Sequence, residues 1–160
     1  MKKSFLIVLF IIAGIIGVNA QTDKGTTLLG GNISFQTSDG TTVFSASPNV
    51  GFFISKNIAL GAQLNFLTGD SFTAWAIGPF IRGYFGGNDK GKIFAQGGIN
   101  IGGATDVDSE VGFGIGGGYA FFLNESVALE LGANYTKAGD SDGLFNMGVG
   151  FQIHFKKRNR

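Results

Sequence analysis

The sequence contains no cysteine, so no disulfide bond can stabilise its 160 residues. It has only two prolines and one histidine, and 14% of its residues are charged, against roughly 25% in ordinary globular proteins. Setting aside Lys2 and Lys3 leaves ten of the twelve lysines and arginines, which face eleven acidic residues. This balance indicates no basic surface for nucleic acid, and we expect no nucleic-acid partner.

Glycine is abundant instead, with 28 residues, and phenylalanine contributes 17. The glycines keep no three-residue period, which excludes a collagen-like chain. Apolar residues make up 44% of the sequence, which excludes a disordered linker. The composition therefore indicates a folded chain that needs many positions without a side chain.

The first twenty residues, MKKSFLIVLFIIAGIIGVNA, predict a cleavable secretory signal peptide. Two lysines precede an apolar stretch at 5–16, and Val18-Asn19-Ala20 resembles a cleavage site. A membrane anchor is the alternative interpretation, but the polar QTDKGTT that follows favours cleavage. The predicted domains are thus the signal peptide at 1–20 and one barrel domain at 21–160.

Residues alternate between apolar and small or polar throughout the remainder, which is the period of a β-strand. In VALELGANYT, one face carries Val127, Leu129 and Leu131, and the other carries Glu130, Gly132 and Asn134. The sequence predicts eight strands, at about 27–37, 42–54, 58–67, 72–85, 92–103, 111–122, 127–137 and 144–155. A basic tail, 156–160, follows the last one.

Seven short connections rich in turn-forming residues join these runs: SDGT, SKN, TGDS, GGNDKG, ATDVDSE, LNES and AGDSDG. Short links favour antiparallel neighbours in an up-and-down order, and closure into a barrel removes both sheet edges. We therefore predict an all-β, eight-stranded antiparallel barrel.

The non-apolar face of the runs decides which side faces water. A soluble barrel covers its outer face with charged residues, whereas this face holds Gly, Ala, Ser, Asn and Gln, with Arg82 and Glu130 as the main exceptions. Such a face suits a narrow interior, and the continuous apolar face would then meet lipid. A soluble periplasmic barrel is the alternative that this argument weakens. The sequence predicts a transmembrane barrel.

Aromatic residues on the apolar face fall into two groups when both termini are placed in the periplasm. The predicted external group is Phe44, Phe66, Trp75, Phe113, Tyr135 and Phe145, and the predicted periplasmic group is Phe52, Phe85, Tyr119, Phe121 and Phe155. Between them lie Ala62, Ile77, Ile99, Ile115, Leu131 and Val149. Two aromatic girdles around an aliphatic belt are typical of a barrel in a bilayer.

The segment VGFGIGGGYAFF contains a G-x-G-x-x-G pattern at Gly112, Gly114 and Gly117. A dinucleotide site needs a helix directly after such a loop, because the helix N-terminus holds the pyrophosphate. Here another alternating run follows, so we interpret the pattern as part of a strand whose Gly112, Gly114, Gly116 and Gly118 face the lumen and leave room inside the barrel.

The segments NVGFFISKNIALGAQLNF, FFLNESVALELGANYT and GVGFQIHF resemble small bacterial outer-membrane β-barrel proteins of the porin-like, eight-stranded family. The first two also align with each other without gaps, at 52–66 and 121–135, as one repeated hairpin. The resemblance implies a bacterial outer-membrane location, reached through periplasmic chaperones and the barrel-assembly machinery. It also implies that Phe155 serves as the aromatic assembly signal, although KKRNR follows the position where the family's chains usually end.

Residues that could perform chemistry are scarce. A catalytic triad needs a nucleophile, a base and an orienting group together, and the lone histidine, His154, has no serine beside it in its strand. Asp106, Asp108 and Glu110 in one external connection, with Asp140 and Asp142 in another, form no complete calcium loop. We predict no enzymatic activity, no metal site and no cofactor.

Arg82 and Glu130 are predicted to face the lumen near the periplasmic ends of their strands. Isolated charges in a narrow interior are costly, so the two are expected to pair across the bore. Inward aromatic residues are predicted in the same half, and polar residues in the outer half. The aromatic set is Phe53, Phe80, Tyr84, Phe94 and Phe122, and the polar set is Gln36, Ser45, Asn65, Asn100, Asn134 and Asn146. The pair either fills the core or acts as a gate.

Two functions remain open from the sequence. The first is a non-enzymatic integral protein of the outer membrane, with a structural role in the envelope or a role in surface interaction. The second is a narrow porin-like channel for small solutes or apolar molecules, which the small bore of eight strands disfavours. Short external connections argue against elaborate receptor roles.

Overall fold

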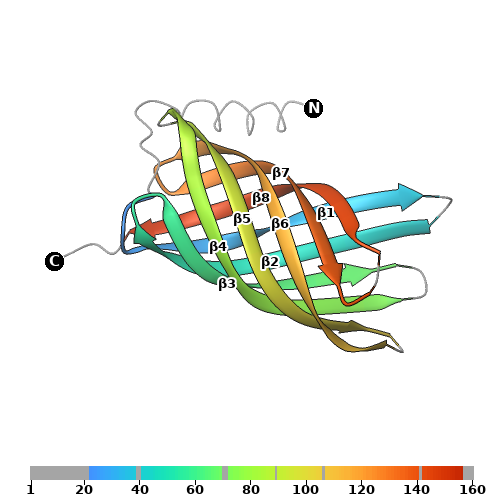
Figure 1. Ribbon diagram of the computed structural model, residues 1–160. Helices are drawn as coiled ribbons and strands as arrows, with labels where there is room; N and C mark the ends of the chain where they lie inside the picture. Colours follow the sequence, from blue (N-terminus) through green and yellow to red (C-terminus); the bar gives the residue numbers. More distant parts are fainter. Residues whose placement is uncertain are drawn as a thin grey trace, which may run out of the picture.

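The computed structural model describes residues 22–38, 41–69, 72–88, 90–105, 107–140 and 142–156, arranged as one barrel (Figure 1). The predicted signal peptide and the last four residues of the basic tail lie outside this part of the chain. The strands are β1 (Thr26–Ser38), β2 (Thr41–Ser55), β3 (Ile58–Thr68), β4 (Thr73–Asn88), β5 (Gly91–Ala104), β6 (Val107–Asn124), β7 (Val127–Ala138) and β8 (Leu144–Lys156).

Every strand pairs antiparallel with its neighbours in sequence, and β1 pairs with β8 to close the barrel. The predicted eight-stranded up-and-down topology is confirmed. We call the end that carries the β2–β3, β4–β5 and β6–β7 connections the turn end, and the opposite end the loop end. The start of β1 and the end of β8 both lie at the turn end (Figure 1).

Two strands extend three or more residues beyond their predicted bounds, whereas the other six extend by at most one residue at each end. β6 begins at Val107, so Asp108 and Glu110 belong to a strand and not to the predicted connection. Glu110 pairs with Gly102, and a register shift after Gly102 carries the pairing on to the end of β5. β4 continues to Asn88 through a similar irregularity. Both extensions lie at the ends of the barrel. There, a strand can carry the polar residues typical of turns because water solvates them, so the sequence predicted a connection where the strand continues.

The barrel is apolar outside and polar inside, the reverse of a soluble protein. Large apolar side chains project outward on every strand and remain exposed, including Ile33 at 52%, Ile99 at 63% and Leu131 at 56%. The buried polar residues are Thr22, Thr26, Ser34, Ser45, Ser47, Asn49, Arg82, Glu130, Gln152 and His154. The predicted assignment of faces is confirmed, and such a surface is suited to lipid contact. Among the residues that the structure describes, no helix is long and apolar enough to cross a membrane.

Outward aromatic side chains gather at the two ends, as predicted. At the loop end, Phe35 and Phe44 are cross-strand partners with ring centroids 5.0 Å apart. At the turn end, Tyr119 and Phe121 lie 4.5 Å apart on β6. Aromatic rings at these levels are the anchors that bilayer interfaces favour.

The glycines of the G-x-G-x-x-G pattern belong to a strand, as expected, and other lumenal glycines give space to aromatic rings. All of residues 112–118 lie within β6, and another strand follows, with no helix between them. At Gly61 a Cβ atom would lie only 2.6 Å from the ring of Phe80, and at Gly132 it would press against Phe94. The rings can occupy the bore because the facing positions have no side chain.

Candidate functional site in the lumen

Arg82 of β4 and Glu130 of β7 meet across the bore. Nη1 of Arg82 lies 3.0 Å from both carboxylate oxygens of Glu130. Neither residue is more than 5% exposed. β4 and β7 are not neighbours in the sheet, so closure of the barrel is what brings the two charges together. Mutual neutralisation reduces the cost of placing these charges in the interior.

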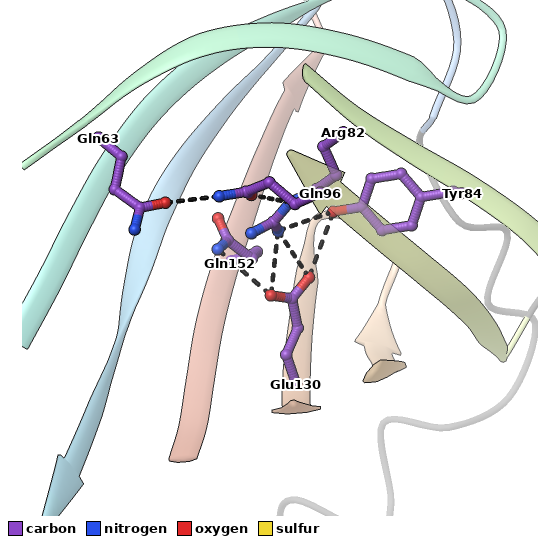
Figure 2. Close-up of polar contacts among 6 residues, drawn as sticks. All are labelled: Gln63, Arg82, Tyr84, Gln96, Glu130 and Gln152. Atoms are coloured by element: carbon purple, nitrogen blue, oxygen red, sulfur yellow. Dashed lines mark hydrogen bonds and ion pairs between the residues drawn. The ribbon is translucent and has the colours of Figure 1, made fainter. Parts of the chain in front are cut away.

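Neighbouring polar side chains complete the hydrogen bonds of the pair, as Figure 2 shows. The hydroxyl of Tyr84 accepts from Arg82 at 3.3 Å and donates to Glu130 at 3.2 Å. Nε of Arg82 donates to Oε1 of Gln96 at 2.7 Å. Gln152 of β8 donates to Glu130 at 3.3 Å. The charges are thereby linked to several strands and held in one arrangement.

The network extends toward the loop end through amides. Nε2 of Gln96 donates to Gln63 at 2.6 Å, and Gln63 donates to Asn65 at 2.7 Å. The guanidinium of Arg82 also lies 4.8 Å above the ring of Phe94, a cation–π distance. The network therefore forms a polar layer across the bore from β3 to β8, which we call the polar plug (Gln63, Arg82, Tyr84, Gln96, Glu130 and Gln152).

Aromatic rings fill the lumen between the polar plug and the turn end. His154 is fully buried, and its ring lies 5.8 Å from Phe53, 6.1 Å from Tyr84 and 5.3 Å from Phe122. Neither ring nitrogen of His154 has a hydrogen-bond partner in the described part of the chain. The histidine therefore packs as one ring of what we call the aromatic layer (Phe53, Tyr84, Phe122 and His154).

The segment before β1 crosses the turn end beneath these rings. Thr22 is 2% exposed, and its hydroxyl donates to Oδ1 of Asn57 in the β2–β3 turn at 2.6 Å. Nζ of Lys92, on β5, donates to the same Thr22 hydroxyl at 3.2 Å and to Asn57 at 2.9 Å. β1 and β5 lie on opposite sides of the barrel, so these contacts span its opening. They form a third closure of the lumen.

The loop-end half of the lumen is open by comparison. A cavity of about 100 Å³ adjoins the polar plug, and one of about 400 Å³ lies beyond it. Asn65, Asn100, Asn134 and Thr136 line both, so the two cavities adjoin. Asp108, Glu110 and Asp142 line the outer cavity. The predicted division into a polar outer half and an aromatic inner half matches this arrangement, except that the side chain of Gln36 lies outside the described residues.

Phe155, in the penultimate position of β8, is 51% exposed on the outer face. Asp106 lies outside the described residues. Within the residues described, no three His, Cys, Asp or Glu side chains form a group that could hold a metal ion.

Sequence reasoning missed Gln63, Gln96, Gln152 and the contacts of Thr22 with Lys92. The alternation places the glutamines on the inward face, which is a usable signal, but it does not reveal what they bond. Thr22 precedes the first strand and carries no periodic signal at all.

Comparison with known proteins gives matches among solved structures only. Neither the scan against protein-family models nor the search of curated proteins gives a match. The N-terminal β-barrel domain of OprF from Pseudomonas aeruginosa is 12% identical, with a TM-score of 0.66 over 82% of this chain and 98% of that chain. Neisserial surface protein A is 17% identical, with a TM-score of 0.64 over 81% of this chain and 96% of that chain.

An enzyme shares the architecture too. The outer membrane enzyme PagL is 14% identical, with a TM-score of 0.50 over 79% of this chain and 98% of that chain. The architecture by itself therefore does not decide between enzymes and other proteins. At these identities the likeness concerns the fold alone, and the chain has the fold of the small eight-stranded outer-membrane β-barrels.

Proposed function

We propose that the mature chain is a non-enzymatic integral protein of the bacterial outer membrane, with a structural role in the envelope. The observation that carries this proposal is a lumen closed by the polar plug, by the aromatic layer and by Thr22, inside a barrel with an apolar exterior. A barrel whose lumen is closed in this way is better suited to a structural role in the membrane than to the passage of solutes. The packing of His154 among the rings of Phe53, Tyr84 and Phe122 supports the non-enzymatic part.

Electrophoresis of the outer-membrane fraction tests the location and the fold. We expect the protein in that fraction, with a mobility that changes between unheated and boiled samples, because a closed barrel resists detergent until heated. A soluble periplasmic protein without such a change would contradict the proposal.

A narrow channel is the second candidate, favoured by the two adjoining cavities in the loop-end half. In this case the Arg82–Glu130 pair is the gate at the bottom of the open half. If the pair is the barrier that limits conductance, and the aromatic layer and Thr22 below it are not, replacing both residues with alanine should raise the single-channel conductance of refolded protein.

The matched control is Asn100→Ala with Asn134→Ala, which enlarges the half that is already open and should leave conductance unchanged. Equal conductance in the parent and the Arg82→Ala/Glu130→Ala protein would count against a gate. It would favour the interpretation that the pair fills the core.

Export and assembly follow from the same proposal. The predicted signal peptide directs the chain across the inner membrane, and periplasmic chaperones and the barrel-assembly machinery are the expected partners. Phe155, exposed at the end of the closing strand, is the proposed recognition element. Its position beside β1 in the finished barrel is compatible with a strand that closes last.

A further inference from the structure

Charge is divided between the two ends of the barrel, although the chain as a whole is nearly neutral. At the turn end, the described charged residues are Lys24, Lys56, Lys90, Lys92 and Lys156, against Asp23 and Glu125. At the loop end they are Asp108, Glu110, Asp140 and Asp142, against Lys137. The overall balance does not reveal this division, because only the topology brings lysines from distant parts of the chain together at the turn end.

Four of the turn-end lysines are exposed: Lys24, Lys56, Lys90 and Lys156. We call them the lysine ring. Lys24 and Lys156 lie beside the β1–β8 pair, Lys56 lies in the β2–β3 turn and Lys90 in the β4–β5 turn. The β6–β7 turn carries Glu125 instead. Lysines therefore occupy three of the four sectors around the opening.

The lysine ring lies at the edge of the apolar belt. Lys156 follows Phe155, which is 51% exposed on the outer face. Lys56 stands between Ile54 and Ile58, which are 39% and 40% exposed. Where lipid-facing side chains end, the headgroups of the surrounding leaflet begin.

We propose that the lysine ring binds the anionic headgroups of phospholipids in the leaflet that surrounds the turn end. This inference rests on the proposed membrane location. Positive charge spread around a perimeter at headgroup depth fits a lipid leaflet better than a single macromolecule, which would dock on one side. Each lysine near an anionic surface attracts it, and salt weakens the attraction. The pair of Lys156 with Asp23, at 3.3 Å, partly offsets one of the four charges.

The test uses the mature chain, residues 21–160, in phosphatidylcholine vesicles that contain spin-labelled phosphatidylglycerol or spin-labelled phosphatidylcholine. We expect the motionally restricted fraction to favour phosphatidylglycerol by about two- to fivefold at low salt, and the preference to disappear near 1 M NaCl. Changing the ring with Lys24→Gln, Lys56→Gln, Lys90→Gln and Lys156→Gln should bring the ratio close to one. The control replaces Asp108, Asp140 and Asp142 with Asn and Glu110 with Gln, which should leave the preference in place.

A preference that survives in the four-lysine variant, or that is absent from the parent chain, would overturn the inference. Salt dependence in the parent chain tests the charge effect even where the variant does not fold. The heat-dependent mobility shift is also measured, for protein in pure phosphatidylcholine. It shows whether the membrane barrel has formed, independently of any preference for anionic lipid.

Discussion

Replacing Glu130 with alanine is expected to lower the free energy of unfolding by about 3–5 kcal/mol, because it leaves the buried Arg82 guanidinium without its counter-charge. Tyr84 and Gln152 would lose a hydrogen-bond partner in the same step. Urea unfolding in lipid vesicles, followed by the fluorescence of Trp75, the only tryptophan, would measure the change.

Two comparisons separate the ion pair from general effects of substitution. Glu110→Ala removes an exposed carboxylate at the loop end and should change stability by no more than about 0.5 kcal/mol. Arg82→Ala with Glu130→Ala should cost less than the sum of the two single changes, since neither charge remains unpaired. A Glu130→Ala protein as stable as the parent would show that water reaches Arg82 and that the polar plug is not a closure.

Leu131→Lys is expected to destabilise the membrane-inserted barrel by about 2–4 kcal/mol, because it places a charge in the middle of the lipid-facing belt. Leu131 is 56% exposed on the outer face, and its cross-strand neighbours are Tyr119 and Val149. The same vesicle unfolding experiment, with the yield of heat-shifted barrel as a second reading, measures the effect.

The matched control is Val111→Lys, near the loop end of β6, where Val111 is 68% exposed. A lysine near the interface should cost only about 0–1 kcal/mol, because its amine can reach the headgroups. The native Lys137, at the far end of β7, is consistent with this tolerance. Equal costs at the two positions would contradict the assignment of the apolar face to lipid.

Strand number, strand order and the face on which each side chain lies could all be predicted from the sequence. Alternation with a period of two assigns each residue to one of two faces, and short connections leave antiparallel neighbours as the simple arrangement. Strand ends were predicted less well: Asp108 and Glu110 were placed in a connection, yet β6 includes them. Beyond the bilayer, polar residues suit a strand as well as a loop, so composition does not mark the boundary.

The sequence by itself determined the barrel, its apolar exterior and the inward direction of Arg82 and Glu130, because each follows from local periodicity. Only the tertiary structure decided which side chains meet across the bore, since contacts between β4 and β7, or between Thr22 and Lys92, depend on closure and stagger of the whole sheet. The same closure gathers lysines from distant turns at one end. The period of two determines whether a side chain faces the lumen or the lipid. Which side chain it contacts across the lumen depends on the curvature of the closed eight-stranded sheet.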